Sequence, residues 1–333
     1  MRMTRERRGV MKVTIVIPNY NGKHFMEECM AALDGQLCRD FEVLVVDNGS
    51  KDGSVAYMKE RYPEVRLIAL DTNTGFSGAV NIGIRESKTP YVLRLNIGTK
   101  VDPAFVGEMI KAIEADDRIF SVSSRMIQMY HPEYIDDAGD MFNLIGWAYQ
   151  RGVGHPVEEY EKPYDVFSAC AGAALYRRDV FEKIGLFDEM HFAYLEDIDV
   201  GYRARIAGYR NVFCPSAKVL HVGSGTSGSK YNEFKVKLAA RNSIYLVYKN
   251  MPLLQLIVNF LPLLLGWLLK YQFFKKQGFA QAFKDGIKEG IRTRKNCKKV
   301  PFRFSNLGHY IRIEWEMITS LFLYAWEYFR RKI

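Results

Sequence analysis

Short runs of apolar residues alternate with amphipathic segments between residue 11 and about residue 124. The runs are rich in β-branched and aromatic residues, as buried strands are, and the segments between them repeat their apolar residues at helical spacing. Alternating strands and helices predict an α/β domain with a mostly parallel, Rossmann-like sheet flanked by helices. The expected strands are 13–17, 41–46, 65–70, 91–95 and 119–122, and the expected helices are 25–33, 54–61, 77–86 and 104–114.

Polar loops that contain glycine follow four of these strands, at residues 18–22, 47–54, 73–83 and 96–103. The carboxyl ends of parallel strands lie along one edge of the sheet, where α/β proteins bind their ligands. Because each loop leads into a helix N-terminus, this edge is suited to phosphate and ribose groups. None of the four loops contains Gly-x-Gly-x-x-Gly, which argues against a nicotinamide dinucleotide.

Three carboxylates, Glu196, Asp197 and Asp199, lie within four positions at the start of an expected helix that runs to Ala207. Neighbouring carboxylates repel one another, and in a partly desolvated site this raises the proton affinity of at least one of them. A general base that takes a proton from a hydroxyl needs such tuning. Acidic residues also favour helix N-termini through the helix dipole, so the pattern alone leaves both interpretations open.

Positive charge is concentrated in one part of the chain. The net charge is +9, but ten Lys and Arg residues stand against two acids between Lys270 and Lys299, directly after an apolar run at 251–269. A nucleic-acid-binding protein would carry its charge on the folded domain, whereas basic residues beside an apolar run indicate an anionic membrane surface. We therefore expect no nucleic-acid partner.

The apolar run at 251–269 is interrupted in a regular way. Its polar and small residues recur at steps of three or four, which places them on one stripe of a helix. Such a helix is expected to lie in the membrane interface or against a partner rather than to cross the bilayer. A second aromatic segment, 315–329, is expected to form a further interfacial helix or a homodimer contact. The stripe consists of Gln255, Asn259, Pro262, Gly266 and Lys270.

The cysteines and the N-terminus indicate a reducing compartment. Five cysteines without metal-ligand spacing predict neither a zinc site nor a disulfide framework. Residues 1–10 are basic, but the apolar stretch that follows is too short for a signal peptide, so we expect a disordered leader.

With these features in place, the chain resembles the family 2 glycosyltransferases of the GT-A fold, and among them the rhamnosyltransferase-like members that build bacterial surface polysaccharides. The matching segments come in the family's order and cover roughly residues 12–245. They are Val16-Ile-Pro-Asn-Tyr-Asn21, Val45-Val-Asp-Asn-Gly-Ser50 with Asp52-Gly-Ser54, Asn73-x-Gly-Phe-Ser-Gly78 with Asn81 and Gly83, Gly185-x-Phe-Asp-Glu189, Tyr194-x-Glu-Asp-Ile-Asp199 and His221-Val-Gly-Ser224.

The resemblance implies a nucleotide-sugar donor and a base-assisted transfer. Asp47 is implied to accept hydrogen bonds from the pyrimidine or ribose of the donor. Asp197 is implied as the general base, which deprotonates an acceptor hydroxyl in a single displacement that inverts the anomeric centre. The other implied residues are Pro18 and Tyr20 against the base, Asn73, Gly75, Asn81 and Asn96 near the pyrophosphate or ribose, Glu196 and Asp199 toward the acceptor or the base, and Trp147 stacked on an acceptor sugar. Helix capping is the alternative for Asp199, and packing in a core or subunit contact for Trp147.

The family's usual metal-binding sequence, Leu-Asn-x-Asp-Thr, is altered here to Leu95-Asn96-Ile97-Gly98-Thr99. Gly98 replaces the carboxylate that would hold Mg²⁺ or Mn²⁺, and hard cations depend on anionic oxygen ligands. Asn96 and His221 are the remaining candidate ligands. Because the acidic cluster is intact, we expect a metal-independent or weakly metal-dependent enzyme, in which cations replace the metal. The candidate cations are Arg94, Lys100 and Arg241.

These observations predict a GT-A domain at 11–245, with a nucleotide-sugar-binding half (11–124) and an acceptor and catalytic half (125–245), followed by a helical membrane-associated appendage at 246–333. The expected reaction transfers L-rhamnose from dTDP-L-rhamnose to a polyprenyl-linked or growing surface polysaccharide, at the cytoplasmic face of a bacterial membrane. A galactosyl-, galactofuranosyl- or glucosyltransferase that uses a UDP-sugar is one alternative. A catalytically inactive, membrane-anchored subunit is the other.

Overall fold

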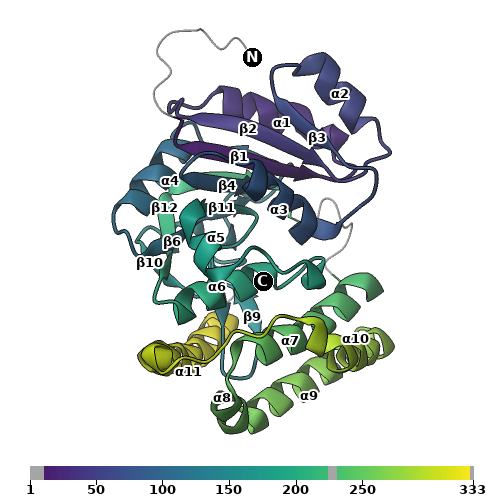
Figure 1. Cartoon of the computed structure of the whole chain (residues 1–333), viewed down its shortest axis with the longest axis vertical. Helices are drawn as coiled ribbons and strands as arrows, with labels where there is room; N and C mark the ends of the chain where they lie inside the picture. Colours follow the sequence, from purple (N-terminus) through teal and green to yellow (C-terminus); the bar gives the residue numbers. More distant parts are fainter. Residues whose placement is uncertain (1–10, 224–230, 331–333) are drawn as a thin grey trace.

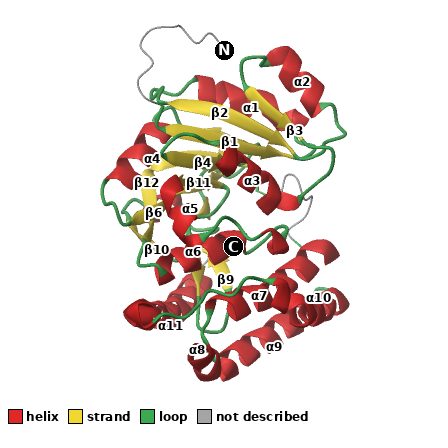
Figure 2. Ribbon diagram, viewed as in Figure 1, coloured by secondary structure: helices red, strands yellow, loops and turns green. Residues whose placement is uncertain are grey.

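A computed structural model describes residues 11–223 and 231–330 of the chain. The expected leader at 1–10 lies outside the described residues. A mixed sheet runs through the upper part of the molecule, with strand order β10-β12-β6-β11-β4-β1-β2-β3 (Figures 1 and 2). Helices of the C-terminal part of the chain form a layer at the opposite end of the molecule (Figure 1).

The predicted parallel strands form one half of this sheet. β1 (Val13–Asn19) pairs in parallel with β2 (Phe41–Asp47) and β4 (Tyr91–Leu95), and β2 pairs in parallel with β3 (Arg66–Ala69). All five expected strands are confirmed, although β6 (Ile119–Gln128) continues six residues beyond its expected end. Val, Ile and Leu fill the central strands, as expected for a sheet that is buried on both faces.

The other half of the sheet is mixed. β11 (Ala173–Arg177) lies antiparallel between β4 and β6, and β12 (Arg210–His221) runs parallel to β6. Short strands extend this half or pair beside it. They are β5 (Thr99–Val101), β7 (Ile135–Asp137), β10 (Tyr164–Val166) and the separate pair β8 (Asp140–Phe142) and β9 (Ala148–Gln150).

Two apolar layers attach helices to the two faces of the sheet. α1 (Lys23–Asp34), α2 (Ser54–Arg61) and α4 (Phe105–Glu114) contribute to the layer on one face. α3 (Gly75–Glu86), α5 (Arg178–Ile184) and α6 (Glu196–Ile206) contribute to the layer on the other. The four predicted helices of residues 11–124 are confirmed, and α6 begins at the acidic cluster as expected.

Five further helices form the C-terminal layer: α7 (Glu233–Asn250), α8 (Leu253–Val258), α9 (Phe260–Lys276), α10 (Ala280–Thr293) and α11 (Leu307–Arg330). α7 runs through residue 245, where we had expected the domain boundary. α10 packs closely on α7, because a Cβ on Gly286 would lie 2.3 Å from the carbonyl oxygen of Lys237. None of the helices in the described residues combines the length and hydrophobicity that a membrane crossing requires.

The C-terminal layer shares a core with the catalytic half of the chain. Ile198 and Tyr202 of α6 belong to the same buried cluster as Ile313 and Met317 of α11 and Leu263 of α9. Because α11 covers one side of α6, the helix that carries the acidic cluster depends on residues more than 100 positions away in the sequence. The two parts are one packed body rather than a domain with a detachable tail.

The polar stripe of the 251–269 run faces the protein. Gln255 and Asn259 are buried, and their amide groups donate hydrogen bonds to Glu314 of α11 at 2.8 and 2.9 Å. A Cβ on Gly266 would overlap the carbonyl oxygen of Ile145. Apart from Leu263 and the partly buried Leu256 and Trp267, most apolar residues of α8 and α9 lie on the opposite, exposed side.

Candidate active site

The predicted base, Asp197, lies in the first turn of α6. Its Oδ1 accepts a hydrogen bond from the backbone N–H of Ile198 (2.8 Å), and its Oδ2 accepts one from Ala171 (3.5 Å). The residue is only partly buried, so one edge of the side chain remains accessible. Desolvation by the surrounding protein raises the pKa of Asp197, which makes it a stronger proton acceptor than a free aspartate.

Asp140 forms a side-chain hydrogen bond with Asp197. Two carboxyl groups can share a hydrogen bond only if one of them holds a proton. Burial raises the pKa of Asp140 well above its ordinary range, and the negative charges of Asp137 and Asp197 raise it further. Asp140 is therefore the protonated donor, and its hydrogen bond lowers the pKa of Asp197 in opposition to burial.

Glu196 and Arg94 complete this cluster. Burial, together with the negative charge of Asp197, raises the pKa of Glu196 to about 8. The Arg94 guanidinium is buried 4.2 Å from the ring centroid of Phe76, and burial lowers its pKa to about 10. Among the described residues, neither Glu196 Oε2 nor Arg94 Nε has a hydrogen-bond partner. Both atoms are buried, so they are polar groups in the interior of the site that the described part of the protein leaves without a partner.

A strained loop leads into the acidic pair. Phe192, Tyr194 and Leu195 have φ angles of 61°, 73° and 66°, in the left-handed region that non-glycine residues rarely adopt. Such conformations cost about 1–3 kcal/mol each and persist only where the surroundings impose them. Gly75 contributes by its lack of a side chain, because a Cβ there would lie 2.5 Å from the ring of Phe192. This close approach gives Gly75 a packing role beside the implied donor role.

The first three donor loops meet at the carboxyl edge of the parallel strands. Asp47 is buried, and its carboxylate accepts hydrogen bonds from Asn19 Nδ2 (2.7 Å) and from the backbone N–H of Ser50 (2.9 Å). Asn73 Oδ1 accepts one from Asn48 Nδ2 (2.9 Å). These bonds tie each loop to the next, as a preformed nucleotide site requires.

The other residues of the predicted base-binding surface lie beside Asn19. Pro18 is half-buried at the end of β1, and Tyr20 is 40% exposed. An exposed aromatic ring beside a tied loop can stack on a nucleobase.

The side chain of Asn81, by contrast, makes its hydrogen bonds within the protein. It is 1% exposed, and its amide donates to the carbonyl oxygen of Phe187 (2.8 Å) and to Glu189 Oε1 (2.9 Å), while its Oδ1 accepts from the N–H of Phe187 (3.0 Å). These bonds join α3 to the 185–189 segment. They leave the Asn81 side chain no free donor for a pyrophosphate.

Asp199 is engaged on both oxygens. It accepts hydrogen bonds from Arg203 Nε (3.0 Å), Lys249 Nζ (2.9 Å) and Asn250 Nδ2 (2.8 Å), and it is fully buried. The positive charges of Arg203 and Lys249 hold its pKa well below the ordinary range despite burial. The third carboxylate of the motif therefore joins α6 to α7 instead of facing an acceptor.

Trp147 packs against the C-terminal layer. Its indole N–H donates to the carbonyl oxygen of Gly266 (3.0 Å), and its ring meets that of Tyr324 with centroids 5.6 Å apart. These contacts match the packing alternative that we weighed against sugar stacking.

Asn96 and His221 lie side by side where the family's metal-binding sequence ends. Asn96 Nδ2 is 3.1 Å from His221 Nε2, and His221 Nδ1 is 2.8 Å from Asp136 Oδ2. A carboxylate behind the imidazole is the usual arrangement of a metal-binding histidine. However, Asp136 is occupied by His221, and Gly98 adds no carboxylate. The set fits a complete Mg²⁺ or Mn²⁺ site poorly.

A second group of donor atoms, on Asp137, Asp140 and Cys170, lies within 4.8 Å. Burial raises the pKa of Asp137 to about 7 and the pKa values of Asp140 and Cys170 well above their ordinary ranges. Metal ligands must lose their protons, so a cation at this group would have to displace protons as it binds.

The cations that we expected to replace the metal are engaged elsewhere. Lys100 forms an ion pair with Glu28 (3.3 Å), and Arg241 forms one with Glu289 (3.1 Å). Arg94 is buried beside the acidic pair. The expectation that Lys100 and Arg241 neutralise the departing diphosphate is therefore not supported by these contacts.

A large cavity in the described part of the chain is separate from the acidic pair. It has a volume of about 820 Å³ and lies between the 182–189 segment and the 296–306 segment. Neither Glu196 nor Asp197 lines it, so this cavity is not the reaction site.

Comparison with known proteins identifies the class of enzyme. The sequence profile of "Glycosyl transferase family 2" matches residues 14–185, and the chain belongs to this family. It is accordingly a glycosyltransferase, with a GT-A type fold.

Named relatives are distant. The N-acetylglucosaminyl-diphospho-decaprenol L-rhamnosyltransferase of Mycobacterium tuberculosis is 27% identical over 241 residues, which cover 64% of this chain and 77% of the relative. An uncharacterized glycosyltransferase of Bacillus subtilis, YwdF, is 26% identical over 251 residues, covering 70% of this chain and 85% of that protein.

Solved structures share the fold. A mannosyltransferase from Pyrobaculum calidifontis, in complex with GDP-Man and Mn²⁺, superposes with a TM-score of 0.53 at 14% identity, covering 97% of this chain and 88% of that one. GalNAc-T7 with UDP, GalNAc and Mn²⁺ superposes with a TM-score of 0.58 at 16% identity, covering 88% and 56%.

Proposed function

We propose that the chain is an inverting rhamnosyltransferase that transfers L-rhamnose from dTDP-L-rhamnose to a lipid-linked saccharide. The observation that carries the reaction type is Asp197, a partly accessible carboxylate with a raised pKa beside the donor loops. The donor and the acceptor rest on the mycobacterial relative, whose name specifies an L-rhamnosyl transfer to N-acetylglucosaminyl-diphospho-decaprenol.

In the proposed reaction, Asp197 takes the proton from an acceptor hydroxyl as the oxygen attacks the anomeric carbon. The new glycosidic bond forms while the bond to the donor diphosphate breaks on the opposite face, so the configuration inverts and dTDP leaves with the electron pair. Glu196, whose pKa is raised to about 8, is protonated at neutral pH and can donate a hydrogen bond to the acceptor. Arg94 supplies positive charge to the same site.

The test compares donors and one variant. Calorimetric binding is measured for dTDP-rhamnose, UDP-galactose, UDP-galactofuranose and UDP-glucose, and transfer is measured to synthetic N-acetylglucosaminyl-diphospho-polyprenol. Asp197→Asn keeps the size of the side chain but removes the base, so we expect transfer to fall at least about 100-fold with donor affinity unchanged. Binding of a UDP-sugar instead would replace the donor assignment, and no binding at all would favour an inactive subunit.

We further propose that transfer depends weakly on metal. His221 and Asn96 would contact a divalent cation if one binds, and such a cation would offset the charge of the diphosphate. The lack of a carboxylate at residue 98 supports weak binding. Donor binding and transfer that persist in EDTA would agree with this proposal, and complete loss in EDTA would contradict it.

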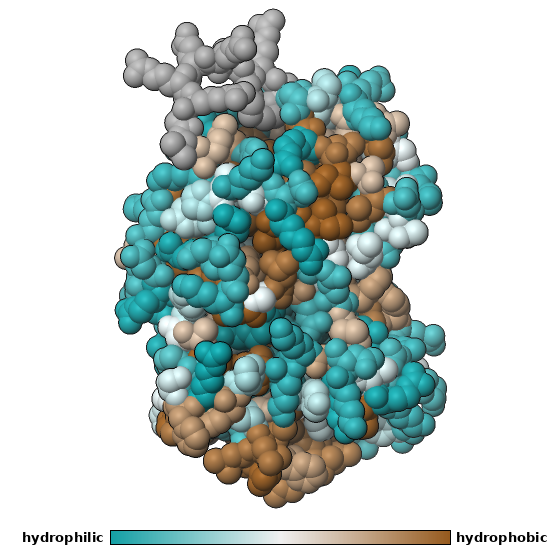
Figure 3. Space-filling view, in the orientation of Figure 1, coloured by the Kyte–Doolittle hydropathy of each residue, from teal (hydrophilic) through white to brown (hydrophobic). Residues whose placement is uncertain are grey.

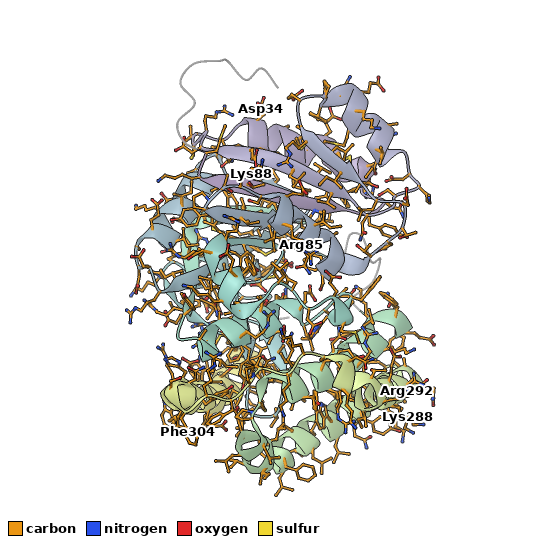
Figure 4. All side chains as sticks on the ribbon, viewed as in Figure 1. Asp34, Arg85, Lys88, Lys288, Arg292 and Phe304 are labelled. Atoms are coloured by element: carbon orange, nitrogen blue, oxygen red, sulfur yellow. The ribbon has the colours of Figure 1, made fainter. Side chains whose placement is uncertain are left out.

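Finally, we propose that the C-terminal layer attaches the enzyme to an anionic membrane surface. The exposed side of α8 and α9 is almost entirely apolar, and α11 adds aromatic residues (Figure 3). Lys288 and Arg292 project from α10 at the rim of the same layer (Figure 4). The large exposed apolar residues are Leu253, Leu254, Ile257, Val258, Phe260, Leu261, Leu264, Leu265, Leu268, Leu269 and Phe273 on α8 and α9, and Leu307, Ile311, Trp315, Phe322, Trp326, Tyr328 and Phe329 on α11.

Point substitutions test this surface, because removal of the layer would expose the core around α6. Leu254 and Leu261 are each 71% exposed, so replacing both by Ser should leave the fold intact and weaken binding to vesicles that contain phosphatidylglycerol. Leu37→Ser is the matched control, since Leu37 is 77% exposed but lies far from the layer in the fold. If the double variant binds vesicles as wild type does but no longer forms a dimer, the surface is a homodimer contact instead.

A further inference from the structure

One amide on α7 holds the loop that leads to the acidic pair. Asn242 is fully buried, and its Nδ2 lies within hydrogen-bond distance of three carbonyl oxygens, those of His191 (2.9 Å), Ala193 (2.8 Å) and Tyr194 (2.8 Å). The amide has two N–H groups, so at least one of them is shared between two of these oxygens. Its Oδ1 accepts from Arg241 Nε at 3.0 Å, which fixes the orientation of the amide. Asparagine is the one side chain of this size that carries an NH2 group, which suits it to bind several carbonyl oxygens.

The carbonyl groups that Asn242 binds belong to the strained segment. The N–H of Ala193 donates to the carbonyl oxygen of His191 at 2.7 Å, so Phe192 is the centre of a tight γ-turn with φ of 61°. Tyr194 and Leu195 follow, also with positive φ. Buried carbonyl groups need partners, and here another helix supplies partners in addition to the one that the loop gives to His191.

Arg241 strengthens the same attachment. One of its terminal nitrogens donates to the carbonyl oxygens of Met190 (3.1 Å) and His191 (3.0 Å), and the other pairs with Glu289 of α10 (3.1 Å). A Cβ on Gly290 would lie 2.8 Å from the Arg241 carbonyl oxygen, so α10 fits closely against this part of α7. The loop is thus fixed to a rigid pair of helices.

We propose that Asn242 is a positioning residue for the transfer reaction. It holds the 191–195 segment in a conformation with positive φ at Phe192, Tyr194 and Leu195, and this conformation directs the carboxylate of Asp197 at the acceptor. Without the three hydrogen bonds the loop relaxes to ordinary φ angles, and the first turn of α6 shifts. The inference rests on the proposed role of Asp197 as the base.

The experiment uses the full chain with dTDP-rhamnose and N-acetylglucosaminyl-diphospho-polyprenol. Asn242→Leu keeps the volume but removes the donors, and kcat is expected to fall about 100-fold, since displacement of a catalytic group by about 1 Å costs that much. The affinity for dTDP-rhamnose should stay within about threefold, because the hydrogen bonds that tie the donor loops to one another do not involve residues 191–195. Ser243→Ala, which removes a hydrogen bond within the same helix, is the control for general damage to α7.

A second readout follows the loop directly. Amide hydrogen exchange of residues 192–197 should accelerate in Asn242→Leu and not in Ser243→Ala. Adding Tyr194→Gly, which makes a positive φ inexpensive, should recover part of kcat, whereas a side chain with only a general structural role would not be rescued. If Asn242→Leu does not fold, Asn242→Ser, which keeps one donor, takes its place.

The outcomes separate this inference from the function on which it rests. An active Asp197→Asn removes the base assignment, whatever the result at residue 242. An inactive Asp197→Asn beside a folded residue-242 variant whose kcat is within about threefold of wild type overturns the positioning role alone. A fall in kcat with unchanged loop exchange also overturns it.

Discussion

The hydrogen bond between Asp140 and Asp197 should control the acidic limb of the pH–rate profile. Asp140 donates as a neutral acid, and this bond favours the ionised form of Asp197. A hydrogen bond to an ionised group contributes about 1.5–3 kcal/mol, and about 1.4 kcal/mol corresponds to one pKa unit. Asp140→Ala should therefore raise the pKa of Asp197 by about one to two units.

The sign follows from the role of a base. As the proposed base, Asp197 must be ionised to take a proton, so a higher pKa in Asp140→Ala is expected to move the acidic limb of kcat/KM to higher pH. Asp140→Asn is the matched variant, because its amide keeps a donor at the same place and cannot ionise. Its acidic limb should stay within about half a unit of wild type. Equal shifts in the two variants, measured from pH 5 to 9, would refute the reasoning.

Three further predictions concern charge, metal and packing. The pKa of Glu196 is 4.5 when free and about 8 in the fold. The native state therefore retains a proton that the unfolded chain loses, and stability should fall as pH rises through this window. Thermal unfolding across the window should show a smaller decline for Glu196→Gln than for wild type. Gly98→Asp should increase the stimulation of transfer by Mn²⁺, because it restores a carboxylate at a position where a Cβ meets no atom closer than 3.8 Å. If calorimetry shows no tighter Mn²⁺ binding in this variant, residue 98 is not part of a metal site. Gly286→Ala should lower the free energy of unfolding in urea by about 1–3 kcal/mol, because its methyl group would clash with the backbone of α7, and an unchanged midpoint would show that α10 can shift.

Local patterns predicted the donor half well. Its strands are short apolar runs that can be recognised locally, and its loops meet because the ends of parallel strands lie at one edge of a sheet. A general rule of α/β topology therefore supplied the long-range part of this prediction. β11 was not predicted, since five residues between loops carry little periodic signal.

Roles that depend on long-range contacts could not be derived in this way. Asp199 looks like part of a catalytic motif, yet it meets Lys249 and Asn250 about 50 positions later. Asp140 and Asn242 lie in no local pattern that relates them to Asp197. The only sequence feature that could have drawn attention to Asp140 was the acidic run that begins at Asp136. For Asn242 it was the neighbouring Arg241, a candidate cation.

The sequence also did not show whether the polar stripe on α8 and α9 faces the protein or the solvent. Periodicity shows that polar and apolar residues lie on opposite sides, but it does not show which side faces the protein. Glu314, which binds both Gln255 and Asn259, decides the question, and it is 55 or more positions away.

The cover that α11 gives to α6 has a consequence for synthesis of the chain. A nascent polypeptide emerges in order, so the donor loops can fold early, but Ile198 and Tyr202 meet Ile313 and Met317 only after more than 100 further residues have left the ribosome. By then α8 and α9 have emerged as well. A chain in which α6 is fully packed therefore already carries its exposed leucines, and the completed site and the exposed apolar surface arise together.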